Sequence, residues 1–106
     1  MTPDEYMSLA QRTSSTEGAT AKLTNGAMGL CGEAGEVADI IKKHLFQKHP
    51  LDSAHIAEEL GDVCWYIAEL CAALDISLSE VLEHNISKLE KRYPNNRFEA
   101  ERSINR

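Results

Sequence analysis

The strongest constraint on the fold is an apolar repeat between residues 56 and 74. Six apolar side chains recur there at spacings of four, three, four, three and four: Ile56, Leu60, Val63, Ile67, Leu70 and Leu74. This period places them on one face of an α-helix, whereas side chains on one face of a strand recur every two residues. The sequence therefore predicts a helix of about five turns that buries one face.

Capping signals place the start of this helix and of two others. Thr2, followed by a proline and then by an acid at position 5, predicts a first helix that ends near Ser14. Either Asp52 or Ser53 can cap the helix that carries the apolar repeat. Ser77, with an acid three residues later, predicts a last helix that ends before Pro94.

Between the first helix and the apolar repeat, a further helical pattern runs from about residue 23 to about residue 47. Its apolar stripe is Leu30, Ala34, Val37 and Ile41. The stripe of the last helix is Leu78, Leu82, Ile86 and Leu89. We expect all of these stripes to lie in the core.

The predicted class is all-α, because no strand pattern appears in the sequence. Short connections favour antiparallel neighbours, so we expect a four-helix, antiparallel bundle-like fold in a single domain over residues 1–106. The polar tail, residues 95–106, stays unassigned. At this length, association of subunits would help the chain to bury more surface.

Composition narrows the function classes. A net charge of −6 argues against broad binding to nucleic acid or to anionic membrane. The three cysteines, Cys31, Cys64 and Cys71, are odd in number and lack CxxC spacing, so we expect small packed thiols and no disulfides. With neither an export signal nor a membrane span in the sequence, the expected location is the cytoplasm.

Two pairs of acids stand out on the central helices. Glu33 and Glu36 lie three residues apart on the second helix, and Glu59 and Asp62 repeat that spacing on the third. Each pair flanks its apolar stripe, so two helices packed by those stripes would bring four carboxylates together. Such a group is stable when a hard divalent cation, Mg²⁺ or Mn²⁺, neutralises it. The alternative is a solvated acidic face.

Glycines accompany these acids. Gly26, Gly29, Gly32 and Gly35 recur every three residues along the second helix. We expect them to clear one side of it for another backbone or for a ligand.

Several other side chains border the same stripes. Asn85, Lys88 and Arg92 share one edge of the last helix and form either a phosphate clamp or a solvated edge. Lys42 either contacts phosphate or complements the helix dipole. Tyr66, like the preceding Trp65, is either a stacking surface for a base or an aromatic packing residue.

Three segments make the chain similar to a known family. "GLCGEAGEVADIIKK", "EELGDVCWYIAEL" and "NISKLEKRYP", within residues 29–94, resemble the MazG-like nucleotide pyrophosphohydrolases, which are described by an ExxE, a spacer and an ExxD. The resemblance implies an all-α fold and hydrolysis of a nucleoside triphosphate, ribo- or deoxy-, to the monophosphate and pyrophosphate. It also implies a homodimer or homotetramer.

The resemblance also assigns roles to individual residues. Glu33, Glu36, Glu59 and Asp62 would hold Mg²⁺, and Glu33 or Glu36 would activate the water. Tyr66 matches a position near the nucleoside. The phosphate-contacting segment of the family matches Asn85, Lys88, Arg92 and Tyr93. Outside the enzyme class, the same features suit a noncatalytic interaction or regulatory module whose acidic edge binds a cation.

Overall fold

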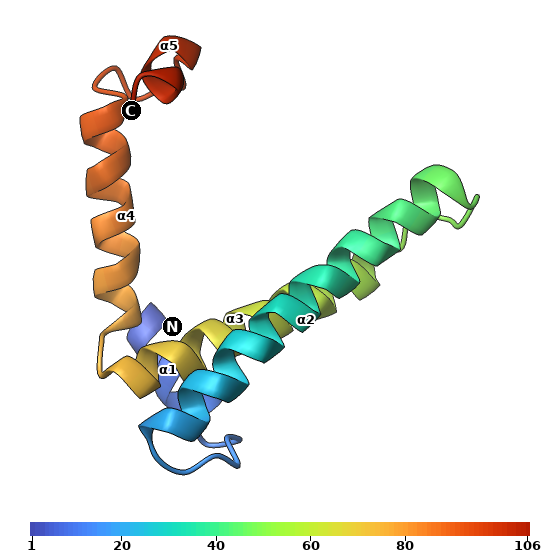
Figure 1. Cartoon of the computed structure of the whole chain (residues 1–106), viewed down its shortest axis with the longest axis vertical. Helices are drawn as coiled ribbons and strands as arrows, with labels where there is room; N and C mark the ends of the chain where they lie inside the picture. Colours follow the sequence, from blue (N-terminus) through green and yellow to red (C-terminus); the bar gives the residue numbers. More distant parts are fainter.

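A computed structural model describes residues 1–106 as five helices without strands (Figure 1). They are α1 (Pro3–Gln11), α2 (Ala19–Phe46), α3 (Ser53–Leu74), α4 (Leu78–Arg92) and α5 (Ala100–Ile104). The predicted all-α class is confirmed. None of these helices combines the length and the apolar character that a membrane crossing needs.

The three predicted capping residues begin their helices. Thr2 Oγ1 accepts a hydrogen bond from the Glu5 amide at 3.0 Å, and an oxygen of Asp52 accepts one from the His55 amide at 3.0 Å. Ser77 Oγ accepts a third, at 3.2 Å, from the amide three residues later. Each satisfies one of the amides that the first turn of a helix leaves unpaired.

Some helix ends differ from prediction. The first helix stops at residue 11, three residues early, and α2 begins four residues early, directly after Gly18. Gly18 has φ of 83°, a backbone conformation that favours glycine. Because glycine has no side-chain atom that could cap the helix, the sequence carries no capping signal at this position. The tail contains the short helix α5, which the sequence left unassigned.

Helices α2 and α3 pack side by side as an antiparallel pair (Figure 1). Two glycines set their close approach. A Cβ added at Gly26 would lie 2.7 Å from Leu70 Cγ, and one added at Gly29 would lie 2.2 Å from the ring of Tyr66. Gly32 and Gly35 have nothing within 4 Å of an added Cβ, so no other helix of the same chain approaches them and the space beside them is open.

Helix α4 leaves this pair and forms the second arm of a V (Figure 1). Its first turn is fixed to α1 at the vertex, where the Asp4 carboxylate accepts hydrogen bonds from Ser77 Oγ at 2.8 and 2.9 Å and from the Ser79 amide at 3.0 Å. Between the two arms the chain turns at Asp75, which adopts the left-handed conformation with φ of 54°. The expected antiparallel packing is therefore confirmed for α2 and α3 and wrong for α3 and α4.

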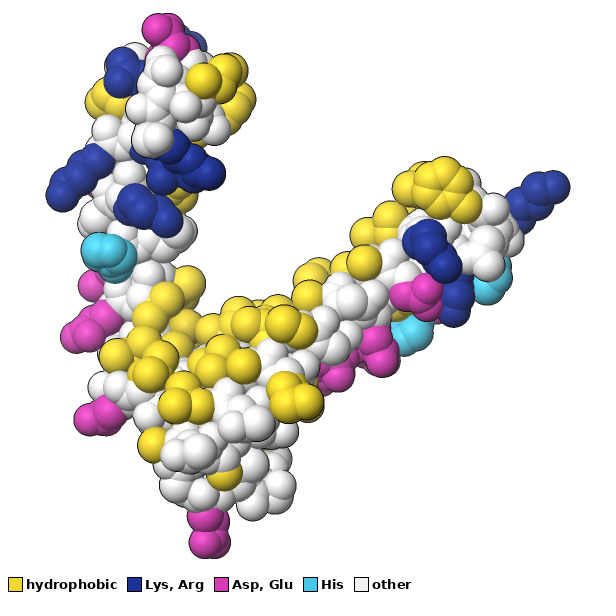
Figure 2. Space-filling view, viewed as in Figure 1, with side chains coloured by type: hydrophobic (Ala, Val, Ile, Leu, Met, Phe, Trp, Pro, Cys, Tyr) yellow, Lys and Arg dark blue, Asp and Glu magenta, His cyan; other side chains and the backbone are white.

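Because α4 stands apart, much of each apolar stripe is exposed. Leu60, Leu74 and Ile86 are 51%, 54% and 54% exposed, and a band of apolar side chains lines the inner side of the V (Figure 2). The prediction that whole stripes lie in the core is wrong for a single chain, since one neighbouring helix covers only part of each stripe. Among the cysteines, Cys71 is buried as expected, but Cys31 and Cys64 are exposed.

Candidate metal centre

Three of the four expected carboxylates converge between α2 and α3. Glu33, Glu59 and Asp62 each place one carboxylate oxygen within 4.8 Å of the others. The antiparallel pairing that brings Gly29 against Tyr66 on α3 also brings Glu33, one turn further along α2, level with Glu59 and Asp62. Glu36 lies outside this group and is exposed. We call the three residues Glu33, Glu59 and Asp62 the acid cluster.

Glu59 is the most enclosed member of the acid cluster. It is 9% exposed, and its Oε2 is buried without a hydrogen-bond partner. Its Oε1 lies 3.3 Å from Nε2 of His55, one turn earlier on the same helix. A buried acceptor without a donor is unfavourable unless another group satisfies it.

The acid cluster also changes the protonation of Glu33. The pKa of Glu33 is raised, first because a protonated Glu33 can share its proton with the adjacent Glu59 carboxylate, and then by desolvation and by the negative charges of Glu59 and Asp62. A proton on Glu33 reduces the repulsion among these carboxylates, and a bound cation would reduce it in the same way. The orphaned Glu59 oxygen and this all-oxygen donor set both fit Mg²⁺ or Mn²⁺, which are hard ions.

A cavity of about 340 Å³ adjoins the acid cluster. It is lined by Thr13, Glu33, Asp62, Trp65 and Tyr66. The rings of Trp65 and Tyr66 meet edge to face, with centroids 5.1 Å apart, so the cavity offers aromatic surface beside carboxylates. Tyr66 also has the packing role that the sequence left open, because its ring covers Gly29.

Trp65 connects this cavity to the amino-terminal segment. Its Nε1 donates to Thr13 Oγ1 at 2.8 Å and also lies 3.1 Å from the Ala10 carbonyl oxygen. An indole has a single N–H donor, and here it fixes the ring against the end of α1. Thr13 is a lining residue that sequence reasoning missed, because a lone threonine in a polar turn carries no signal.

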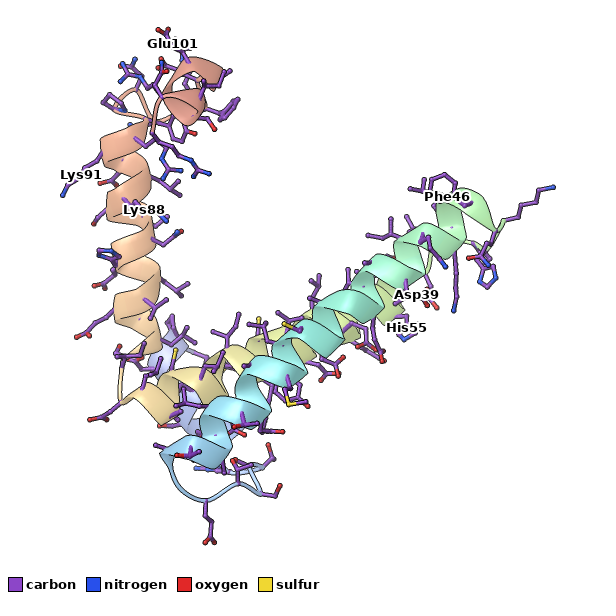
Figure 3. All side chains as sticks on the ribbon, in the orientation of Figure 1. Asp39, Phe46, His55, Lys88, Lys91 and Glu101 are labelled. Atoms are coloured by element: carbon purple, nitrogen blue, oxygen red, sulfur yellow. The ribbon has the colours of Figure 1, made fainter.

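The remaining candidates lie away from the acid cluster. Lys42 and Lys43 both pair with Asp39, at 3.6 and 2.9 Å. Asp39 and His55 point to the outer side of the α2–α3 arm, whereas Lys88 lies on the α4 arm (Figure 3). Within one chain the acid cluster and the expected phosphate clamp are therefore on different arms.

The α4 candidates have other neighbours at the far end of their arm. Tyr93 packs on Phe98, with ring centroids 5.6 Å apart. Arg92 lines a separate polar cavity with residues of the tail, among them Glu99 and Arg102. Asn85 and Lys88 are exposed.

Sequence reasoning also missed Glu69, an acid within an otherwise apolar stretch of α3. Glu69 is fully buried and is hydrogen-bonded by side chains of the segment from residue 11 to residue 25. Its position within an apolar stretch of α3, one turn beyond Trp65, was the available signal, since a buried acid requires polar partners.

Comparisons with known proteins agree with this geometry. Residues 22–97 match the family model described as the MazG nucleotide pyrophosphohydrolase domain. The chain is also 45% identical, over 69 residues, to the Gene 37 protein of Mycobacterium phage L5; the match covers 61% of this chain and 60% of that protein. The chain thus spans about 60% of the length of this relative, whose name states no activity. No solved structure matches the chain.

Proposed function

Because the chain belongs to the MazG nucleotide pyrophosphohydrolase family, we propose that it is a divalent-metal-dependent enzyme that cleaves a nucleoside triphosphate to the monophosphate and pyrophosphate. The substrate is a ribo- or deoxyribonucleotide, and removal of surplus or noncanonical nucleotides is a suitable role. The observation that carries the proposal is the acid cluster with its orphaned Glu59 oxygen, directly beside a cavity with aromatic lining.

Glu33, Glu59 and Asp62 would hold the metal. Bound Mg²⁺ or Mn²⁺ would supply positive charge against phosphate oxygens and so permit an anionic substrate to approach carboxylates. Glu36, exposed and one turn along α2 from Glu33, is free to accept a proton from the attacking water at a carboxylate oxygen. Tyr66 offers its ring to the nucleoside from the lining of the adjoining cavity.

The phosphate clamp requires a second copy of the chain in this proposal. Asn85, Lys88 and Arg92 lie on α4, the other arm of the V, and Tyr93 follows it directly, so a partner subunit would bring them to the acid cluster. Lys88 and Arg92 would then neutralise the departing pyrophosphate. Lys42 is held by Asp39 at 3.6 Å and would have to exchange that exposed ion pair for a phosphate.

Exposed apolar surface supports an oligomer, a homodimer or homotetramer. Figure 2 shows apolar side chains along the inner side of both arms, and the exposed large apolar residues of α3 and α4 include Leu60, Leu74, Leu82 and Ile86. Contiguous apolar surface of this kind marks an interaction site in a water-soluble fold. A second copy presents the same surface, so a twofold pairing would cover both at once.

A nucleotide panel tests the activity. Purified protein is incubated with ribo- and deoxynucleoside triphosphates with and without Mg²⁺, and the products are separated by chromatography. We expect monophosphate and pyrophosphate only with the metal, their loss in Glu59→Gln, and their retention in Glu58→Gln, which removes an exposed acid next in sequence. Binding of Mg²⁺ without consumption of any nucleotide would instead favour a regulatory module.

Complementation tests the shared site. Glu59→Gln and Lys88→Ala chains are each expected to be inactive, but co-refolded mixtures contain dimers with one intact site. We expect the mixture to recover about a quarter of the wild-type rate, since about half of the dimers are mixed and each has one of two sites intact. An inactive mixture that nevertheless contains mixed dimers would refute a site built from two subunits.

A further inference from the structure

Glu69 is the only large side chain that is completely buried in the chain. Its two carboxylate oxygens are surrounded by donors. Oε1 accepts hydrogen bonds from Gln11 Nε2 at 3.0 Å and from Ser14 Oγ at 2.7 Å, and Oε2 accepts from Asn25 Nδ2 at 2.7 Å. Thr16 Oγ1 donates to Oε2 at 3.1 Å. These contacts satisfy both oxygens of the buried carboxylate.

The charge of Glu69 is also paired. Lys22 Nζ lies 3.3 Å from Oε1 and further contacts Gln11 Oε1 at 2.9 Å and Ser14 Oγ at 3.1 Å. Burial alone would favour protonation, but the hydrogen bonds outweigh it and lower the pKa of Glu69 to about 2. The carboxylate is therefore ionised at neutral pH.

All of these donors come from one segment, residues 11–25, which contains the end of α1, the α1–α2 turn and the start of α2. The network therefore does not join the two arms of the V. It fixes this amino-terminal segment onto α3. A buried ion pair is often replaceable by apolar residues without loss of stability, so stability alone does not explain its presence.

The fixed segment forms a wall of the cavity beside the acid cluster. Thr13 lines that cavity and lies between Gln11 and Ser14, both of which donate to Glu69. Trp65 is one helical turn before Glu69 and donates to Thr13. Glu69 itself is two turns, about 10 Å along the helix, from Asp62, so it does not reach the acid cluster.

We propose that Glu69 is a positioning residue for nucleotide binding: it holds Thr13 and Trp65 together as the wall that receives the nucleoside. This inference rests on the proposed function. Because the wall contacts the nucleoside and not the reacting phosphate, a loose wall weakens binding of substrate and leaves the chemical step intact.

The test compares Glu69→Gln with a matched control. In Glu69→Gln an amide NH₂ faces donors where a carboxylate oxygen accepted hydrogen bonds, and the charge that pairs Lys22 is lost. Glu83→Gln makes the same chemical change at an exposed site on α4 without a hydrogen-bond partner. Ser14→Ala is a milder variant that removes one donor and leaves the charge paired. Far-UV circular dichroism at the assay temperature checks that each variant is folded.

Steady-state kinetics and Trp65 fluorescence are then measured on the same samples. We expect KM to rise about tenfold in Glu69→Gln and about threefold in Ser14→Ala, with kcat within about twofold of wild type in both. The chain has a single tryptophan, so its emission reports Trp65 directly without nucleotide. We expect a shift to longer wavelength in Glu69→Gln as the indole loses Thr13, and none in Glu83→Gln.

Results that contradict the positioning role of Glu69 differ from those that contradict the proposed function. Folded Glu69→Gln with unchanged KM, or with kcat reduced in place of KM, would overturn the positioning role. Unchanged Trp65 emission would overturn it as well, and this measurement does not depend on any activity. A wild-type protein that consumes no nucleotide would overturn the proposed function, whereas the fluorescence would still decide whether Glu69 positions Trp65.

Discussion

Glu69 allows the stability of this fold to be predicted as a function of pH. Its pKa in the folded protein is about 2, against an ordinary value of 4.5. Each pH unit between the two values corresponds to about 1.4 kcal/mol. Ionised Glu69 therefore contributes about 3 kcal/mol to the free energy of unfolding at neutral pH, relative to its protonated form.

The sign of the dependence follows from the depressed pKa. The contribution is complete above the unfolded-state value of 4.5 and is lost as the pH falls toward the folded-state value of about 2. From pH 7 to pH 3.5 the loss is about 1 kcal/mol, because at pH 3.5 the unfolded chain binds a proton at this group and the folded chain does not.

The assay is urea unfolding followed by circular dichroism at 222 nm, at one fixed protein concentration because association adds to stability. Other acids titrate in the same range, so the informative quantity is the difference between wild type and Glu69→Gln. We expect the variant to be about 3 kcal/mol less stable at pH 7 and the difference to shrink by about 1 kcal/mol at pH 3.5. A difference that stays constant over this range would refute the assignment of a buried, ionised Glu69.

Three further predictions concern packing and association. Gly29→Ala should lower the free energy of unfolding by about 1–3 kcal/mol in urea titrations, because the new Cβ would lie 2.2 Å from the Tyr66 ring. Gly32→Ala, with open space around its Cβ, should raise the free energy of unfolding by up to about 1 kcal/mol. Equal effects of the two substitutions would contradict the described packing of α2 on α3. Asp4→Asn should lower the melting temperature measured by calorimetry, because an amide oxygen accepts the hydrogen bond from Ser77 more weakly than a carboxylate does and α4 is held less firmly to α1. An unchanged melting temperature would show that this contact does not anchor α4. Ile86→Glu should convert oligomers to monomers in sedimentation velocity, and an unchanged sedimentation coefficient would exclude the exposed apolar stripe of α4 from the interface.

The sequence predicted those parts of the fold that local patterns determine. Capping by Thr2, Asp52 and Ser77 is encoded by side chains that bond to nearby amides, so each start could be placed. The direction of α4 was not accessible, because it depends on Asp75 adopting a left-handed conformation and on a tertiary contact to Asp4. Periodicity identifies the apolar face of a helix but not the element that covers it.

For the candidate site too, local patterns predicted some features, whereas others depend on how distant parts of the chain meet. The convergence of Glu33, Glu59 and Asp62 followed from their places beside two apolar stripes that pack together. The exclusion of Glu36 from that group did not follow, because a spacing of three residues keeps two side chains on one face but does not bring them within 5 Å of a third on another helix. Glu69 and its donors were inaccessible for a related reason, since they are distant in sequence and meet only after folding.

Binding of Mn²⁺ decides whether the acid cluster is a metal site. Free Mn²⁺ is measured by electron paramagnetic resonance during titration of wild type, Glu59→Gln and the neighbouring Glu58→Gln, with Mg²⁺ added afterwards as a competitor. We predict saturable binding to wild type and to Glu58→Gln that Mg²⁺ displaces, and binding at least about tenfold weaker in Glu59→Gln. Equal Mn²⁺ affinity in wild type and Glu59→Gln would contradict the account.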